Sequence, residues 1–427
     1  MATNYLKGEP LELRWRSSWC EHQARTIPSL FQSQAETLGD STLYLVKREG
    51  TYQPVSWQTV RRDVETLAAA LIARGVQPGD RVAILSENRY EWVVADLAIL
   101  HAGAISVTLH FPLTPTQVEE QLRDSESVAI FVSNATQAQK VEQVRERLPA
   151  LKHFFSFEPL SGWVALGELQ EEGRRLLREK PRLVDETAES LNWDSLATII
   201  YTSGTTGESK GVMLSHGNLL ASVYAAMRVF PPPDRNYVML NFLPLSHIYA
   251  RTCDYLASMA LGVELAFAES IDTLREDLQA IRPHAINGVP RFYEKVRERV
   301  LEVTQSKPLL RLLGKFARKK GLQRAFGGRL IWAISGGAAK PRPTRMPASE
   351  NDFERVRSTS TLSCWRTRRR ALSAAKSTYA SSTTSSPATW PARAAIASTG
   401  TKVPDGALGL QTIVTRAPAA ARPSGKV

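Results

Sequence analysis

The chain has 427 residues, of which 43% are hydrophobic, with a formal net charge of +12 and three cysteines. This length supports two or more globular domains with a sizeable core and excludes a small disulfide-stapled scaffold. Cys20, Cys253 and Cys364 lie far apart without metal-ligand spacing, so we interpret them as ordinary thiols in a reducing compartment. No stretch reaches the roughly 18 apolar residues of a membrane span. We therefore expect a cytoplasmic protein, and peripheral association with a membrane stays open.

The first 339 residues alternate between helix-like and strand-like patterns. Residues 57–74 are apolar at helical spacing, and residues 82–85 form an apolar strand pattern after a Pro-Gly-Asp turn. Residues 90–101 predict a second helix, and residues 104–109 predict the next strand. Strands that are separated by helices of this length are typical of parallel sheets. We therefore predict an α/β fold with doubly wound parallel sheets.

The most informative segment runs from residue 199 to residue 216 and reads IIYTSGTTGESKGVMLSH. Gly204 and Gly207 allow backbone N–H groups to approach an anion closely, and Lys210 adds a positive charge. The flanking hydroxyl donors are Thr202, Ser203, Thr205 and Thr206. The spacing differs from a Walker A loop, and residues 211–214 predict a strand after the loop instead of a helix. These features predict a polyphosphate-binding loop between two strands; the alternative is a flexible hairpin without a ligand.

This segment resembles the signature loop of the adenylate-forming, AMP-binding enzyme superfamily, which includes acyl-CoA synthetases, luciferases and peptide-synthetase adenylation domains. The resemblance rests on Tyr201 to Gly207 followed by Lys210 and Gly211. It implies a loop that closes over the β- and γ-phosphates of ATP, in which Lys210 neutralises charge and the leaving pyrophosphate is oriented. It also implies ATP and Mg²⁺ as cofactors and leaves the metal ligands unknown.

Two later segments resemble motifs of the same superfamily, closest to its long-chain fatty acid CoA ligases. Residues 241–249, NFLPLSHIY, place His247 where the family borders the acyl pocket and the approach of the thiol of coenzyme A. A histidine packed in the core is the alternative. Residues 288–296, GVPRFYEKV, resemble the border of the fatty-acyl channel and imply that Tyr293 contacts the acyl substrate. A plain strand-to-helix turn with Pro290 near the helix start is compatible with that interpretation.

A third segment, ISGGAA at residues 334–339, resembles the turn that contacts adenine in the family. The resemblance implies that Gly336, Gly337 and Ala338 meet the flat base. A glycine turn that ends a strand is the alternative.

The composition changes at about residue 340. Residues 341–427 hold 14 Lys and Arg against 4 Asp and Glu, whereas residues 1–340 hold 40 against 38. Leu, Ile, Val and Phe make up 11 of these last 87 residues, which is below the roughly 20% that a packed core requires. We therefore divide the chain into an adenylate-forming domain at 1–339 and a basic low-complexity tail at 340–427. The tail is expected to be disordered or encoded out of frame.

The resemblance implies a two-step reaction in which a long-chain fatty acid and ATP give acyl-AMP, and coenzyme A then displaces AMP. It covers about the first 340 residues. The family's ribose-binding motif, hinge and catalytic C-terminal lysine are not recognisable after that point, so we expect little or no activity from this chain. The alternatives are a non-catalytic degenerate synthetase that binds nucleotide or acyl ligand, and an adenylating enzyme for another carboxylic acid. Binding of nucleic acid by the arginine-rich tail is a further alternative, but the nearly neutral remainder predicts no specific nucleic-acid partner. The oligomeric state stays unknown.

Overall fold

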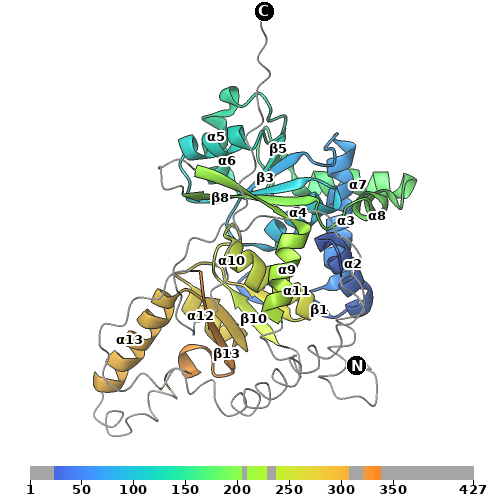
Figure 1. The fold of residues 1–427 in the computed structure, drawn as a ribbon. Coiled ribbons are helices and arrows are strands. Elements are labelled where there is room, and N and C mark those ends of the chain that lie inside the picture. Colours follow the sequence, from blue (N-terminus) through green and yellow to red (C-terminus); the bar gives the residue numbers. More distant parts are fainter. Residues whose placement is uncertain (1–23, 204–208, 228–236, 307–320, 322, 338–427) are drawn as a thin grey trace, which may run out of the picture. The chain divides into compact units, whose positions relative to one another are not determined.

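The computed structural model describes residues 24–203, 209–227, 237–306, 321 and 323–337. These residues form two sheets of mainly parallel strands with helices packed on their faces, so the predicted α/β class is confirmed (Figure 1). The predicted tail at 340–427 lies outside the described residues, and the domain boundary before it stays a prediction. None of the described helices is both long and apolar enough to cross a bilayer.

The seven-stranded sheet has the order β7 (Val164–Ala165), β6 (His153–Ser156), β5 (Ala129–Val132), β3 (Arg81–Leu85), β4 (Ile105–Leu109), β8 (Leu196–Ser203) and β9 (Ser209–Ser215). The six-stranded sheet has the order β13 (Trp332–Ser335), β12 (Ala285–Gly288), β10 (Val238–Asn241), β11 (Glu264–Phe267), β1 (Thr42–Arg48) and β2 (Thr51–Ser56). All strand pairs are parallel except β8–β9 and β1–β2, each at one edge of its sheet.

The described helices are α2 (Ile27–Leu38), α3 (Trp57–Ala73), α4 (Tyr90–His101), α5 (Pro115–Asp124), α6 (Ala135–Glu142), α7 (Leu166–Glu179), α8 (Leu183–Glu189), α9 (His216–Met227), α10 (Ile248–Ala250), α11 (Ala257–Leu261), α12 (Leu274–Ile281) and α13 (Pro290–Ser306). A 3-10 turn, η1 (Arg145–Arg147), and a π-helical turn, η2 (Arg251–Leu256), complete them. The predicted helix at 57–74 is α3. Ser56 caps its start by accepting the N–H of Thr59 at 3.2 Å, and Gly75, at φ +87°, follows its end.

Side-chain alternation along the strands divides the apolar residues into three clusters. In β3, Val82 and Ile84 belong to a central core, whereas Ala83 and Leu85 belong to a cluster with α5 and α6. Met239 of β10 joins the same central core from the six-stranded sheet. Because successive residues of a strand point to opposite faces, the two sheets share the central core on their inner faces. The outer faces are covered by α5 and α6 on one sheet and by α12 and α13 on the other.

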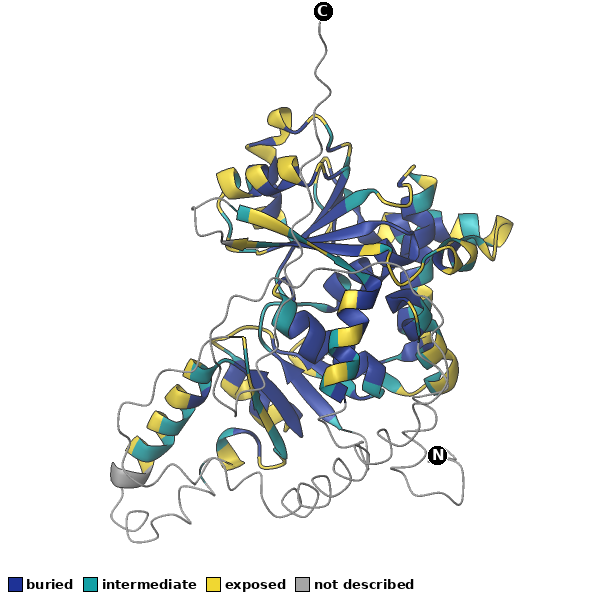
Figure 2. Ribbon diagram, in the orientation of Figure 1, coloured by how far each residue is buried: buried dark blue, intermediate teal, exposed yellow. Residues whose placement is uncertain are grey.

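Helix α4 lies in the central core, and all of its residues except Glu91 are buried (Figure 2). A helix that is apolar on every side is typical of a position between two layers. The predicted helix at 90–101 and the strand that follows it, β4, are both confirmed. Asp96 is fully buried in the middle of this helix.

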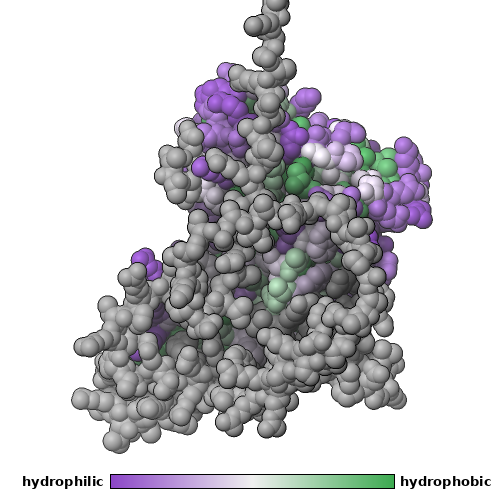
Figure 3. Space-filling model, in the orientation of Figure 1, coloured by the Kyte–Doolittle hydropathy of each residue, from purple (hydrophilic) through white to green (hydrophobic). Residues whose placement is uncertain are grey.

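Helix α7 covers α3 with one face and leaves the other face in solvent. Gly173 lies so close to α3 that a Cβ there would be 1.7 Å from the carbonyl oxygen of Thr66. Arg174 and Arg175 on the opposite face are partly exposed and pair with Glu171. This outer surface is hydrophilic in Figure 3. The close approach at Gly173, together with an apolar face that includes Leu166 and Leu169, therefore packs α7 onto the fold.

Candidate functional site

The hairpin of β8 and β9 carries the predicted phosphate-binding residues at its end. Thr202 pairs with Lys210 across the two strands, and both residues are exposed. Ser203 pairs with Ser209 at the last described position of the hairpin. The predicted residues Gly204, Thr205, Thr206 and Gly207 lie in the loop outside the described residues. A strand follows this loop, as predicted, so the Walker A arrangement of a loop followed by a helix is excluded.

Helix α5 holds this hairpin from one side. The Tyr201 hydroxyl lies 2.7 Å from Oδ2 of Asp124 and 3.0 Å from the carbonyl oxygen of Gln121. A Cβ at Gly211 would lie 3.0 Å from the Ile199 side chain and 3.3 Å from the Tyr201 ring. Tyr201 and Gly211 of the motif thus have structural roles that direct the end of the hairpin, and Thr202 and Lys210 are exposed there.

The seven-stranded sheet reverses its winding between β3 and β5, because β3 connects to β4 on one side and β5 connects to β6 on the other. Open α/β sheets bind ligands at such a point, outside the carboxyl ends of the strands. Here Asn88 donates to the Leu243 carbonyl at 2.7 Å and accepts the Leu245 N–H at 2.9 Å. From β4, Thr108 donates to the Ser246 carbonyl at 3.2 Å. The segment that leads to His247 is therefore held at the carboxyl ends of β3, which borders this switch point, and of β4.

His247 is exposed at the start of α10, so the alternative of a histidine packed in the core is excluded. Its Nδ1 accepts the N–H of Tyr249 at 3.2 Å, which assigns the proton of the neutral ring to Nε2. Loss of solvent around part of the ring lowers the pKa of His247. The pKa of His110 is also lowered, first by burial and second by repulsion from a charged His247. Nδ1 of His110 lies 3.1 Å from Oγ of Ser246. Two neutral imidazoles thus meet at the site at neutral pH, and His247 presents an N–H donor.

Tyr249 connects this segment with the glycine turn after β13. A Cβ at Gly336 would lie 2.6 Å from the Tyr249 ring, and Gly337 has a φ of +71°, so both positions favour glycine. The N–H of Gly336 donates to the carbonyl of Gly288 at the end of β12, at 3.1 Å. The structure therefore brings the predicted adenine turn next to the His247 segment. Ala338 lies outside the described residues.

Tyr293 lies on the outer face of the six-stranded sheet and is buried. Its hydroxyl is 2.9 Å from the carbonyl oxygens of Ile286 and Ile334, so it ties β12 to β13. The strand-to-helix turn predicted at Pro290 is confirmed, since α13 begins there directly after β12. These contacts are structural, and the acyl-substrate role that the resemblance implies for Tyr293 stays a prediction.

Below the His247 segment lies a buried polar chain that sequence analysis missed. Asn88 donates to Oδ1 of Asn241 at 2.7 Å, and Asn241 donates to Oδ2 of Asp254 at 2.7 Å. Asn287 donates to the other carboxylate oxygen of Asp254. A signal was available, because Asn241 and Asn287 are polar residues at or near the ends of otherwise apolar strands. Such residues in buried strands indicate a polar network.

A buried ion pair joins the π-helical turn η2 to the hairpin. Arg251 and Asp96 have fully buried side chains and lie 2.5 Å apart, between Nη2 and Oδ1. Arg251 also donates to Oγ1 of Thr198 on β8 at 2.6 Å, and Ser106 donates to Asp96 at 2.6 Å. One-turn π-helices occur frequently at functional sites. Arg251 therefore fixes the base of the phosphate-loop hairpin relative to the segment that follows His247.

The sequence profile of the AMP-binding enzyme family matches residues 31–361. The chain belongs to this family. The predicted resemblance to AMP-forming acyl-CoA synthetases is thereby confirmed, and the match extends beyond residue 340, where the composition changes.

Two curated relatives are named as long-chain ligases. The chain is 34% identical over 258 residues to the long-chain-fatty-acid–CoA ligase FadD15 of Mycobacterium tuberculosis, with 60% of this chain and 42% of the relative covered. It is 30% identical over 316 residues to the long-chain-fatty-acid–CoA ligase ACSBG2 of Xenopus laevis, with 70% and 42% covered. The chain thus spans about two fifths of the length of these relatives.

Solved structures support the fold. The adenylation domain of a carboxylate reductase from Mycobacterium chelonae has a TM-score of 0.62 at 22% identity, with 82% of this chain and 59% of that chain covered. The N-terminal domain of FACL13 from Mycobacterium tuberculosis has a TM-score of 0.56 at 23% identity, with 75% and 71% covered. These likenesses confirm the adenylate-forming architecture of the described residues.

The family implies ATP and coenzyme A, and the described residues fit part of ATP. Lys210 and Thr202 offer a charge and a hydroxyl to phosphates, and the turn at Gly336 and Gly337 offers backbone groups to a base beside the Tyr249 ring. The buried Tyr249 hydroxyl has no hydrogen-bond partner among the described residues, which leaves it available to a polar ligand atom. In the described ranges, no three His, Cys, Asp or Glu side chains are grouped to hold a metal ion by themselves, and the Mg²⁺ that the resemblance implies stays a prediction.

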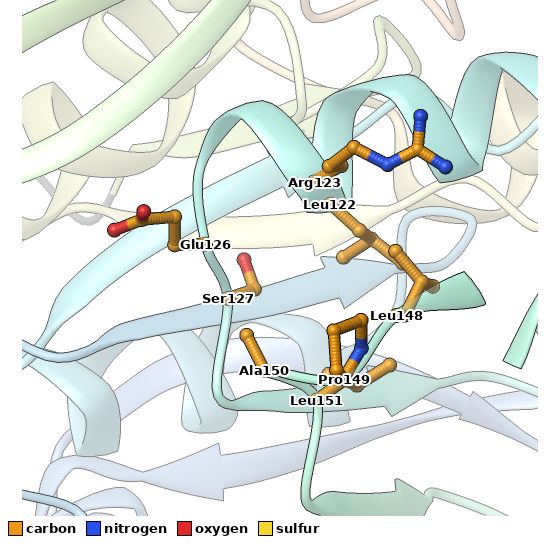
Figure 4. Close-up of a pocket in the computed structure, with 8 residues that line it drawn as sticks. All are labelled: Leu122, Arg123, Glu126, Ser127, Leu148, Pro149, Ala150 and Leu151. Atoms are coloured by element: carbon orange, nitrogen blue, oxygen red, sulfur yellow. The ribbon is translucent and has the colours of Figure 1, made fainter. Parts of the chain in front are cut away.

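A small pocket of about 200 Å³ lies elsewhere on the seven-stranded sheet (Figure 4). It is formed where α5 ends and where the chain enters β6. Its lining residues are Leu122, Arg123, Glu126, Ser127, Leu148, Pro149, Ala150 and Leu151. None of the predicted site residues belongs to this lining, so the pocket is separate from the candidate site.

Proposed function

We propose that the chain carries the nucleotide-binding half of an AMP-forming long-chain fatty acid CoA ligase. In the proposed reaction, the fatty carboxylate attacks the α-phosphate of ATP, pyrophosphate leaves, and the thiol of coenzyme A then displaces AMP from the acyl group. The observation that carries the proposal is the contact of Tyr249 with Gly336 and Gly337, which joins the acyl-side and adenine-side motifs at the carboxyl ends of the strands. The names of the relatives support the long-chain substrate.

In this proposal Lys210 and Thr202 hold the phosphates of ATP, together with the loop from Ser203 to Gly207. A fixed positive charge at the hairpin end offsets the charge that the leaving pyrophosphate gains. His247 orients the acyl group or the thiol through its Nε2–H. It does not act as a general base, because its Nδ1 lone pair already accepts the Tyr249 N–H.

We further propose that residues 1–427 alone make little acyl-CoA. The support comes from the sequence, because no ribose-binding motif and no catalytic lysine segment is recognisable in residues 340–427. A robust rate of acyl-CoA synthesis by the purified chain would contradict this proposal, and it would leave the assignment of the acid unchanged.

Acyl sulfamoyl-adenosines, which are stable mimics of acyl-AMP, test the acid without requiring turnover. We expect the hexadecanoyl compound to bind at least about tenfold more tightly than the benzoyl compound, because two buried methylenes already contribute about 1.6 kcal/mol. Isothermal titration calorimetry on the full chain measures both affinities. Tighter binding of the benzoyl compound would favour an enzyme for aryl acids, and a lack of binding by either compound would remove the proposed nucleotide site.

A further inference from the structure

Asp254 joins the carboxyl ends of two strands of the six-stranded sheet. It is 1% exposed, and its Oδ2 accepts an N–H of the Asn241 side chain at 2.7 Å. Its Oδ1 accepts an N–H of the Asn287 side chain. Asn241 is the last residue of β10, and Asn287 is the third of the four residues of β12. A single carboxylate therefore determines how the ends of these neighbouring strands are held together.

From Asn241 the contacts continue to the His247 segment. The Asn241 amide also donates to the Leu243 carbonyl at 3.0 Å, and its Oδ1 accepts the Asn88 amide at 2.7 Å. Asn88 in turn accepts the N–H of Leu245, two residues before His247. Displacement of Asn241 would therefore be transmitted to the backbone that carries the imidazole.

From Asn287 the contacts continue to the glycine turn. Asn287 pairs in parallel register with Ile334, and the next pair is Gly288 with Ser335. Gly288 then accepts the N–H of Gly336 at 3.1 Å. Both walls of the candidate site, the His247 segment and the glycine turn, are thus attached to the carboxylate of Asp254 through one asparagine each.

The surroundings of Asp254 supply amide donors and uncharged groups. The two asparagines supply the amide donors. The titratable groups that face Asp254 are Cys253 on its own turn, Tyr249 at the glycine turn and Tyr293 on α13. Burial raises the pKa of Cys253 to about 12 and raises the pKa of both tyrosines, so all three are neutral at pH 7. Burial raises the pKa of Asp254 to about 7, against a smaller lowering by the two amide donors.

The protonation state of Asp254 decides how many amides it holds. An ionised carboxylate only accepts hydrogen bonds, so both oxygens receive an N–H. A protonated carboxyl carries an O–H donor on one oxygen, and one of the two asparagine amides then has to release its contact or rotate. The ordered arrangement in the structure is the one that the ionised form supports.

We propose that Asp254 is a positioning residue of the candidate site, whose ionised carboxylate holds Asn241 and Asn287 and thereby sets the spacing between the His247 segment and the glycine turn. The part of this inference that concerns ligand binding rests on the proposed function. In this proposal Asp254 acts through Asn241 and Asn287 and does not itself contact the substrate or the nucleotide. Ligand affinity is expected to fall as the pH drops through about 7, where Asp254 takes up its proton.

The test compares ligand affinity in the wild-type full chain, in Asp254→Asn and in the exchanged pair Asn241→Asp/Asp254→Asn. In the exchanged pair, the new amide at 254 donates to the new carboxylate at 241. The hydrogen bond between the two positions is thereby kept, with donor and acceptor exchanged. Hexadecanoyl sulfamoyl-adenosine is the probe, and its affinity is measured by calorimetry between about pH 6 and pH 8.5.

For the wild-type chain we expect affinity to fall at least about fivefold from pH 8 to pH 6. Asp254→Asn is expected to bind at least about tenfold more weakly at pH 8 and to show no such pH dependence, while the exchanged pair recovers to within about threefold. A purely structural role would lower the melting temperature without changing the pH profile of affinity. Wild-type affinity and pH profile in Asp254→Asn would overturn the inference.

Thermal unfolding without ligand separates this inference from the proposed function. Because the folded pKa of Asp254 lies above the ordinary 3.8, the folded chain takes up a proton between those pH values. The contribution of Asp254 to the free energy of unfolding is therefore largest at low pH, falls as the pH rises to about 7, and is constant above that. The difference in melting temperature between wild type and Asp254→Asn should follow this course. If the probe does not bind to wild type, the proposed function fails; a difference independent of pH overturns the inference itself.

Discussion

Replacing Asp96 by alanine is expected to lower the free energy of unfolding by about 3–5 kcal/mol, because Arg251 would then be buried without a carboxylate partner. Both side chains are fully buried, and Nη2 of Arg251 lies 2.5 Å from Oδ1 of Asp96. The substitution also removes the acceptor of the Ser106 hydroxyl. Urea denaturation followed by tryptophan fluorescence measures the loss, with Trp92, whose ring lies 5.8 Å from the Arg251 guanidinium, as a local reporter.

Arg299→Ala is the matched control for this substitution. Arg299 pairs with Glu302 at 2.6 Å, but the two side chains are 74% and 66% exposed, so solvent screens the pair. We expect its denaturation midpoint to equal that of the wild type. The double variant Arg251→Met/Asp96→Leu should recover much of the stability that Asp96→Ala loses, since an apolar pair needs no charge compensation. Equal midpoints for Asp96→Ala and the control would show that the buried pair does not stabilise the fold.

Replacing Lys210 by alanine is expected to weaken ATP binding by about 30-fold, which corresponds to one lost charge-assisted hydrogen bond of about 2 kcal/mol. Lys210 is exposed at the end of the β8–β9 hairpin, opposite Thr202, where it is available to the outer phosphates. AMP lacks those phosphates, so its affinity should change less than about threefold. Calorimetry with ATP and with AMP on the full chain gives both values.

Lys180→Ala is the control for Lys210→Ala, because Lys180 is an exposed lysine at the end of α7 and belongs to no predicted site. It should bind ATP as the wild type does. An equal loss of ATP and AMP affinity in Lys210→Ala would indicate that the hairpin is disturbed as a whole. Unchanged ATP affinity would exclude Lys210 from the phosphate site.

Elements with strong local patterns could be predicted from the sequence. Helix α3 has apolar residues at helical spacing, a serine cap and a glycine after its end, and each of these signals lies within the segment itself. Helix α4 has no side-chain cap and is apolar on nearly every side, but Gly103 marks its end, and the strands that follow both helices have clear local patterns as well. The β8–β9 hairpin could also be predicted, because two strand patterns flank a Gly- and Thr-rich loop.

Partners that lie far apart in the chain could not be predicted in this way. Asp96 and Arg251 are 155 positions apart, and Asn287 follows Asp254 by 33 positions. Periodicity shows that such residues are buried, but it does not show which residue compensates their polarity. Tyr293 illustrates the same limit, because the motif implies an acyl-substrate role, which stays a prediction, and gives no sign that the hydroxyl contacts two strand carbonyls.

A crystal structure of the chain with hexadecanoyl sulfamoyl-adenosine tests the central claim most directly. We expect the adenine ring to lie against Gly336 and Gly337, the sulfamoyl group on the side of Lys210, and the start of the acyl chain beside His247. Adenosine bound at another place, such as the pocket at the end of α5, would contradict the proposed function, and so would a chain that stays unliganded at saturating concentrations of the compound.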